Sequence, residues 1–376
     1  MTVRDADLKL NRNIFIETAL TYALTYVYSI TSSIIPPASI TILADNDYYS
    51  TSASTQSSKD RFHDFAVPLS QAHKTGLGSS AALVTAFTAA VLTYYLPADL
   101  FNLEDETSRR RLHNLAQASH CAAQGKVGSG FDVASAVYGS CLYRRFSPSI
   151  LSTTLDAGSK GFANQLRDVV DEKPSSNGPG AWDTEVVKDA VRVPRGLRLV
   201  MCDVDCGSQT PGMVKKVLNW RIEQNVEAEK MWESLQEANE AVTHELKRLA
   251  DAGDHDYSGL RQCIQNVRKG IREMSNSSGV PIEPPAQTRL LDACSELPGV
   301  IGGVVPGAGG YDAVALLIED SEEVVDNLAR LFAEWTFEGS GNAAAVTGGK
   351  VRMLGVREEM EGVRLEDPNG YSVWIS

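Results

Sequence analysis

Apolar residues recur every three or four positions near the start of the chain, which predicts an amphipathic helix. Asn13 is a suitable N-terminal cap, and the apolar face then runs from Phe15 to Val27. Two prolines at 36–37 are expected to end the helix, because the residue before a proline disfavours helical backbone. Glu17 and the many Thr and Ser residues of this segment favour a buried helix over a membrane span.

The first half of the chain continues with alternating strand and helix patterns. After Gly78 the apolar residues follow a period of 3.6, with Leu83, Phe87 and Val91 on one face. The expected elements are a strand at 38–43, an exposed loop at 45–60, a strand at 65–69, a helix after Gly78, a helix at 108–123 and a strand at 140–146.

The second half is predicted to begin after residues 171–181 (DEKPSSNGPGA), which have the composition of a flexible connection. A strand at 197–203, a long helix with an apolar face from Ala228 to Leu249, a glycine-rich stretch at 299–310, a strand at 312–318 and a helix at 321–332 follow. The chain therefore divides into two predicted domains, residues 1–185 and residues 186–376.

Composition supports a packed globular protein and restricts its partners. The 376 residues are 43% hydrophobic and 22% charged, which suffices for two cores. The net charge of −13 argues against nucleic acid and anionic membranes as partners. It also requires that any phosphate site be locally cationic or built from backbone amides.

The cysteines indicate free thiols. No Cys-x-x-Cys pair occurs, which argues against structural zinc, and six cysteines are few for a disulfide scaffold of this length. The N-terminus lacks the apolar core of a signal peptide. A cytoplasmic protein is expected. The cysteines are Cys121, Cys141, Cys202, Cys206, Cys263 and Cys294.

A glycine-rich segment directly before the predicted helix is the first candidate for chemistry. Glycines let the backbone approach a ligand closely, and the unpaired N–H groups of a helix start bind anions without any net positive charge. Lys74 adds a cation, and a hydroxyl of Ser79 or Ser80 can bind magnesium. A tight turn capped by serines explains the same residues equally well. The segment consists of Gly76, Leu77, Gly78, Ser79, Ser80 and Ala81.

Asp132 is the second candidate, because it follows a flexible turn, Gly128-Ser129-Gly130-Phe131. A carboxylate there can accept a proton from a substrate hydroxyl or orient that hydroxyl. Taken alone, an Asp beside glycines is more often a turn residue or a helix cap.

Three segments in a fixed order resemble the GHMP kinase superfamily, which is named for galactokinase, homoserine kinase, mevalonate kinase and phosphomevalonate kinase. They are residues 76–81 (Gly-Leu-Gly-Ser-Ser-Ala), 128–132 (Gly-Ser-Gly-Phe-Asp) and 306–312 (Pro-Gly-Ala-Gly-Gly-Tyr-Asp). Residues 123–134, 143–148 and 205–211 resemble, more narrowly, the eukaryotic and especially the fungal phosphomevalonate kinases.

The resemblance implies an α+β, two-domain fold, with a ribosomal protein S5-like first domain and a ferredoxin-like second domain. It implies transfer of a phosphoryl group from ATP, with Mg2+, to 5-phosphomevalonate in isoprenoid and sterol synthesis. Asp132 and Lys74 would be catalytic, Gly76 to Ala81 would hold the nucleotide, and Ser80 would bind magnesium. The residues expected near the acceptor are Lys126, Ser129, Gly130, Ser208, Thr210, Gly307, Ala308, Gly309 and Gly310.

Several of these roles have plain alternatives. Lys126, like Arg144 and Arg145, is either a ligand of the substrate phosphate or a solvated surface charge. Ser208 and Thr210 are equally suited to capping a helix.

The chain departs from the family pattern in two places. Family members begin with a strand and a Pro-Gly-Lys segment, and nothing in residues 1–12 matches it. The resemblance therefore implies a first domain that is incomplete at its start and a chain of weak or no activity. Mevalonate kinase also carries a Glu about eleven residues before the catalytic Asp, where this chain has His120, Cys121 and Ala122. Another kinase of the superfamily, such as mevalonate kinase, and a non-catalytic ligand-sensing relative are the alternative functions.

Overall fold

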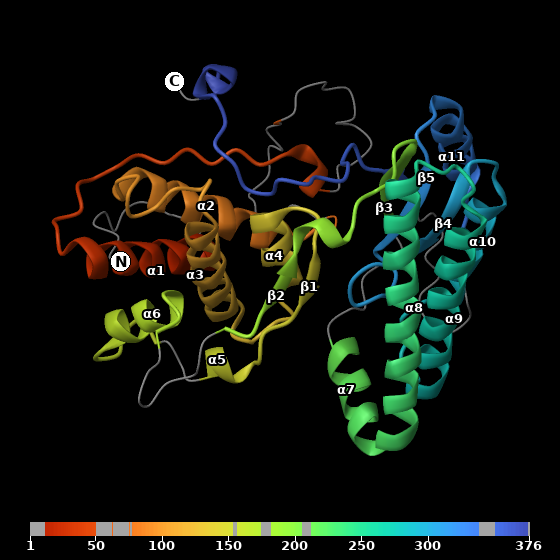
Figure 1. Ribbon diagram of the computed structural model, residues 1–376, viewed down its shortest axis with the longest axis horizontal. Coiled ribbons are helices and arrows are strands. Elements are labelled where there is room, and N and C mark those ends of the chain that lie inside the picture. The colour runs from red at the N-terminus through yellow and green to blue at the C-terminus, as the bar shows by residue number, and fades with distance from the viewer. Residues whose placement is uncertain are drawn as a thin grey trace.

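The computed structural model describes residues 12–49, 62, 75, 77–152, 156–173, 182–204, 212–337 and 350–374. These residues form two bodies that lie side by side (Figure 1). The elements of the first body are α1 (Ile14–Thr31), η1 (Asn46–Tyr48), α2 (Ser79–Tyr95), α3 (Glu106–Gln124), α4 (Phe131–Tyr138), β1 (Leu142–Arg144), α5 (Ser149–Ser152), α6 (Phe162–Val170) and β2 (Glu185–Val187).

The second body contains a larger sheet and its covering helices (Figure 1). From the connection between the bodies onward, the elements are η3 (Lys188–Ala190), β3 (Leu197–Val204), α7 (Met213–Glu223), α8 (Asn225–Ala252), α9 (Ser258–Ser278), α10 (Pro285–Glu296), β4 (Val300–Val304), β5 (Ala313–Glu319), α11 (Glu322–Glu334), β6 (Val351–Met353) and η4 (Pro368–Tyr371).

Helix α1 begins where the sequence predicts. The Asn13 side chain accepts hydrogen bonds from the backbone N–H groups of Phe15 (3.1 Å) and Ile16 (3.3 Å). The helix ends at Thr31, several residues before the proline pair, because Ser32 turns into the left-handed region (φ 51°). Within the described ranges, no helix has both the length and the apolar character that a bilayer span requires.

The segment that follows α1 lies over α2 as extended chain (Figure 1). The structure assigns no strand to residues 38–43, so the strand predicted there is wrong. Among the described residues, none pairs with this segment in a ladder. Ile40 and Ile42 remain more than 40% exposed. The strand predicted at 65–69 lies outside the described residues.

The sheet of the second body has the strand order β4-β5-β3-β6, and each neighbouring pair is antiparallel. Along the chain the pattern is strand, helices, strand, strand, helix, strand. A βαββαβ chain with its first and third strands in the centre is the ferredoxin-like arrangement, as the sequence predicts. The two-domain α+β architecture is therefore confirmed.

Both faces of this sheet are covered by helices. Leu316 of β5 is buried with Leu290 of α10 and Leu328 of α11 on one face. Its neighbour Leu317 points to the other face and packs with Leu249 of α8. The alternation follows from the two-residue period of a strand, and it explains why β5 is apolar along its whole length.

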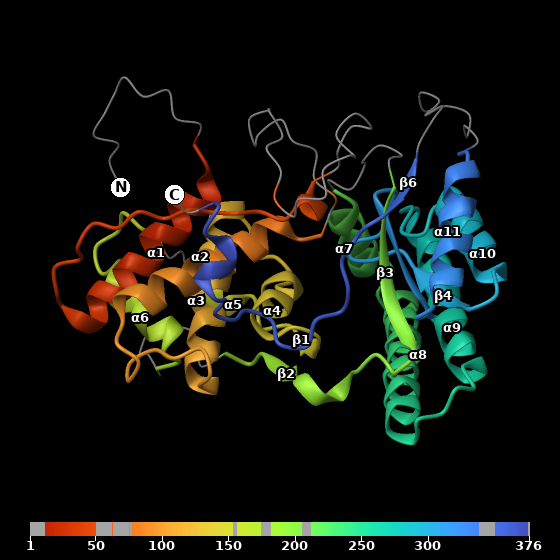
Figure 2. The ribbon, with the colours of Figure 1, turned by 90° about the horizontal axis from the view of Figure 1, so that it is seen from above.

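The C-terminal segment returns from β6 to the first body (Figure 2). The Ser140 N–H donates to the Glu359 carbonyl (2.6 Å), and Arg109 Nη1 donates to the Glu361 carbonyl (3.0 Å). At its other end Leu354 N–H donates to the Met201 carbonyl of β3 (2.9 Å). This segment therefore joins the two bodies. The predicted domain boundary, between residues 185 and 186, stays a prediction, and it falls within β2, which pairs with β1.

Candidate active site

The turn before α2 has the geometry of an anion site at a helix start. Gly78 is left-handed (φ 73°, ψ 30°), and among the described residues no side chain caps α2. The Gly78 carbonyl accepts the N–H groups of Ala81 (3.0 Å) and Ala82 (3.1 Å). The positive end of the helix dipole lies at this uncapped first turn, which suits a phosphate group. Of the other predicted residues, Lys74 and Gly76 lie outside the described residues.

Asp132 lies against this turn. A Cβ atom added to Gly78 would come within 3.6 Å of the Asp132 Cβ, although the two residues are far apart in the sequence. The aspartate stands in the first turn of α4, and its Oδ1 accepts the N–H of Val133 (2.9 Å). The two segments that the sequence singled out therefore meet, with a carboxylate beside the uncapped helix start.

Gly130 fixes the turn that carries Asp132. It is left-handed (φ 83°) and serves as the N-terminal cap of α4. A Cβ at this position would lie 2.6 Å from both the Gln117 Oε1 and the Tyr143 hydroxyl. The Tyr143 hydroxyl donates to the carbonyl of Ser129 (3.0 Å), which holds the turn from the other side. Only glycine satisfies both the conformation and the space here.

His120 joins the glycine turn to α3, which sequence reasoning did not predict. Its Nε2 lies 3.1 Å from the Ser80 Oγ and 3.2 Å from the Gln124 Nε2. The side chain is 2% exposed, and the ring packs against Phe15 of α1. Burial lowers the pKa of His120 below its usual range, and a carboxylate, Asp132, opposes this shift. A buried, uncharged imidazole thus holds the Ser80 hydroxyl.

The other predicted basic residues lie at the edge of this region. Lys126 is exposed just beyond the end of α3. Arg144 forms an ion pair with Glu185 across the small sheet (3.3 Å), and Arg145 Nη2 donates to the Val127 carbonyl (3.1 Å). Arg145 therefore supports the loop that leads to Asp132. Their predicted contacts with a substrate phosphate stay predictions.

The glycine turn between β4 and β5 is fixed within the second body. Gly310 N–H donates to the Ile282 carbonyl (2.8 Å), and a Cβ on Gly309 would lie 2.4 Å from that same oxygen. Gly307 and Ala308 are exposed at the tip. The predicted role of this turn near the acceptor stays a prediction. Ser208 and Thr210 lie outside the described residues.

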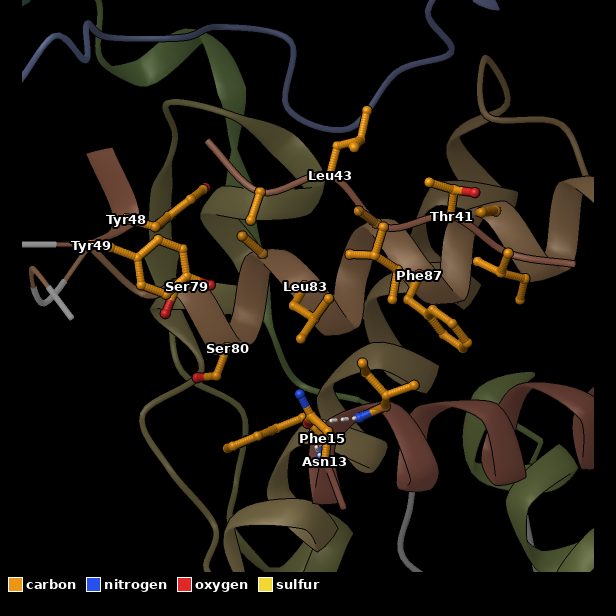
Figure 3. A pocket seen from close by; sticks show the side chains of 17 residues that line it. Asn13, Phe15, Thr41, Leu43, Tyr48, Tyr49, Ser79, Ser80, Leu83 and Phe87 are labelled. Atoms are coloured by element: carbon orange, nitrogen blue, oxygen red, sulfur yellow. Dashed lines mark hydrogen bonds between the residues drawn. The ribbon is translucent and has the colours of Figure 1, made fainter. Parts of the chain in front are cut away.

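An apolar cavity of about 540 Å³ opens beside the start of α2 (Figure 3). Ser79 and Ser80 stand near one end, with Tyr48 and Tyr49 close to them, and Leu83 of α2 forms part of the wall. The extended segment at 40–44 covers it from the side. The cavity depends on contacts between distant segments, and the sequence therefore gave no signal for it.

Metal binding by protein atoms alone is not favoured at this site. In the part of the chain that the structure describes, no group of three His, Cys, Asp or Glu side chains could hold an ion. The oxygen donors beside the helix start are the Ser80 hydroxyl and the Asp132 carboxylate, and magnesium prefers oxygen ligands. A magnesium ion brought by a nucleotide fits this donor set, since it keeps water and phosphate oxygens as its other ligands.

Comparisons with known proteins agree with these features. Residues 64–140 match the family described as GHMP kinases N terminal domain, and residues 257–334 match GHMP kinases C terminal. The chain is 52% identical over 375 residues to phosphomevalonate kinase erg8 of Aspergillus fumigatus, with 97% of this chain and 76% of that protein aligned. It is 34% identical to the phosphomevalonate kinase of Candida albicans, with 98% and 83% aligned.

One solved structure supports the fold. The Lin0012 protein of Listeria innocua superposes with a TM-score of 0.60 at 19% identity, covering 93% of this chain and 83% of its own. At that identity the likeness concerns the fold alone.

Proposed function

This chain belongs to the phosphomevalonate kinase family, and we propose that it transfers the γ-phosphoryl group of ATP to 5-phosphomevalonate. A phosphate oxygen of the acceptor attacks the γ-phosphorus, the bond from that phosphorus to the bridging oxygen breaks, and ADP and 5-diphosphomevalonate leave. The observation that carries the proposal is that Asp132 lies against the turn at Gly78, where an added Cβ would be 3.6 Å from the Asp132 Cβ. The names of the fungal relatives agree with it.

In this proposal the phosphates of ATP lie at the start of α2. The backbone N–H groups of the first turn and the hydroxyl of Ser79 bind them, and Lys74 adds a positive charge. Ser80 and Asp132 hold magnesium, which neutralises phosphate charge when it is bound. The nucleoside takes the adjoining cavity, whose apolar wall and two tyrosines suit a base and a ribose.

Asp132 in this proposal orients the acceptor more than it deprotonates it. The acceptor phosphate is already ionised near neutral pH, so a strong base contributes little. Positioning and charge neutralisation then carry the reaction. Lys126, Ser129 and Gly130 stand next to Asp132 in sequence and bind the acceptor from the first body. The residues that bind it from the second body are Ser208, Thr210, Gly307, Ala308, Gly309 and Gly310.

The acceptor preference of the purified protein tests this function. We expect kcat/KM for 5-phosphomevalonate to exceed that for mevalonate by about a hundredfold or more, because a site built for a charged group rejects an analogue that lacks it. Phosphorus NMR should show the new diphosphate. A preference for mevalonate would favour mevalonate kinase activity. ATP binding without transfer to either acceptor would favour a non-catalytic relative.

We also propose that the protein is cytosolic and that it binds neither nucleic acid nor membranes. The net charge of −13 opposes binding to polyanions. The cysteines in the described ranges are free thiols, as in reducing compartments. Microscopy of a fluorescent fusion tests the location.

His120 is expected to act through Ser80. When its Nε2 is unprotonated, it accepts a hydrogen bond from the Ser80 hydroxyl and shares this lone pair with the amide N–H of Gln124. Both lone pairs of the Ser80 oxygen then remain for magnesium or a donor. We expect His120→Leu to weaken MgADP binding about tenfold, the range typical of residues that orient a metal ligand. His120→Gln, which keeps a polar atom near Nε2, should weaken it less than about threefold. Titration calorimetry measures both.

Thermal unfolding of both His120 variants is the control for that experiment. Equal losses of affinity in the two variants, in step with their losses of stability, would show that His120 serves only the packing of α1 against α3.

A further inference from the structure

A second cavity, of about 420 Å³, lies in the first body away from the glycine turn. It is bounded by α3, by Tyr138 at the end of α4, and by the chain from Trp182 to Lys188. None of the residues that line it belongs to the nucleotide or acceptor site proposed above. Its floor contains His113, a side chain that is 1% exposed and that the proposed reaction does not use.

The neighbouring Asn114 determines the protonation of the His113 ring. The Asn114 amide nitrogen donates to the Val170 carbonyl (3.2 Å) and to the Glu172 Oε1 (3.1 Å), and both of these atoms are acceptors only. The amide oxygen of Asn114 must then be the atom that lies 3.3 Å from the His113 Nδ1. An oxygen accepts, so Nδ1 carries the hydrogen.

It follows that the His113 Nε2 is a bare acceptor. Burial lowers the pKa of His113 to about 4, and the ring is therefore uncharged near neutral pH. Within the described part of the chain, its buried Nε2 has no hydrogen-bond partner, and neither does the buried Oγ1 of Thr184, which lines the same cavity. Buried polar atoms without partners are rare and costly, which favours a donor group that enters the cavity.

The charges around the cavity are already balanced. Arg110 forms an ion pair with Glu172 (3.6 Å), and Arg109 donates to two backbone carbonyls, of Leu103 and Glu361. The full set of charged residues that line the cavity contains equal numbers of each sign: Glu104, Glu106, Glu172, Arg109, Arg110 and Lys188. A charged ligand would gain little from such a wall.

Three rings form much of the remaining wall. The ring of His113 lies 5.8 Å from that of Trp182 and 5.6 Å from that of Tyr138. The Trp182 indole N–H donates to the Val169 carbonyl (2.9 Å), so Trp182 offers only its ring face or edge to the cavity. We propose that this cavity is a second small-molecule site, which takes an uncharged ligand with an apolar or aromatic body and a hydroxyl group that donates to the Nε2 of His113.

Phenol and toluene form the matched pair of probes that tests this proposal on the purified protein without nucleotide. They share size and ring, and only phenol has a donor. We expect phenol to bind about threefold to tenfold more tightly than toluene, the range of one net hydrogen bond. Nitrogen NMR of labelled imidazoles should show the Nδ1–H form of His113 and a shift of its Nε2 when phenol is added.

Two variants assign the binding to this cavity. His113→Leu should reduce the affinity for phenol to that for toluene. The control variant is His255→Leu, at an exposed histidine of the second body, and it should leave the affinities for phenol and toluene unchanged. If His113→Leu does not fold, Thr184→Val removes the other unpaired polar atom and should also weaken phenol more than toluene.

Equal affinities for the two probes, no binding of either, or an unprotonated Nδ1 would overturn the proposal. The cavity would then hold only water at His113. The probe experiment does not involve turnover. A negative result for this cavity therefore does not bear on the proposed kinase function, and a negative result for the kinase function does not bear on this cavity.

Discussion

The Asp132→Asn enzyme is expected to lose about a hundredfold or more in kcat while its affinity for ADP without magnesium changes less than about threefold. The carboxylate adjoins the Gly78 turn, where a Cβ would lie 3.6 Å from the Asp132 Cβ. Its charge is therefore placed to orient the acceptor and any magnesium ion in the transition state. Asparagine keeps the shape and the bond to the Val133 N–H but removes the charge.

Steady-state kinetics and ADP titration separate the two effects. Glu322→Gln is the matched control, because Glu322 is an exposed acid and the substitution also removes one negative charge from the first turn of a helix, α11. Its turnover should remain unchanged. Unchanged turnover of Asp132→Asn would exclude this carboxylate from the mechanism, and a parallel loss of ADP affinity would assign it to nucleotide binding instead.

The parts of the fold that the sequence predicts correctly depend on neighbours in the chain. The Asn13 cap, the left-handed Gly78 before α2 and the turn that leads to α4 each involve residues within four positions of one another. Strand β3 is equally clear, since four consecutive apolar residues, Leu199 to Cys202, form its centre. Local rules of capping, glycine conformation and periodicity suffice for such elements.

The parts that could not be predicted depend on contacts between distant segments. The bond between Ser80 and His120 joins residues forty positions apart, and nothing near His120 marks it as a partner of the glycine turn. The segment at 38–43 has the alternation of a strand, yet a strand exists only where another chain segment pairs with it. The site was thus predicted as separate motifs, and the structure adds the side chains that hold them together.

Gly130 illustrates this difference. Its backbone conformation depends on neighbouring residues of the chain, whereas the side chains around it come from distant segments. We expect Gly130→Ala to lower the free energy of unfolding by about 3 kcal/mol. A left-handed alanine costs about 1 kcal/mol, and the clash of its Cβ, 2.6 Å from the Gln117 and Tyr143 oxygens, adds about 2 kcal/mol. The turn must also shift, and with it Asp132, so kcat/KM should fall more than about tenfold.

Gly125→Ala separates the two contributions. Gly125 is also left-handed (φ 66°) and ends α3, but a Cβ there would meet no atom of the described residues within 4 Å. Gly125→Ala should lower the free energy of unfolding by only about 1 kcal/mol and leave turnover unchanged. Denaturant unfolding and steady-state rates of both variants measure this. Equal losses of stability would mean that the space around Gly130 adapts to a methyl group and that only its backbone conformation requires glycine. A greater loss at Gly130, with a fall in turnover, would mean that Gln117 and Tyr143 hold Asp132 in place through this one glycine.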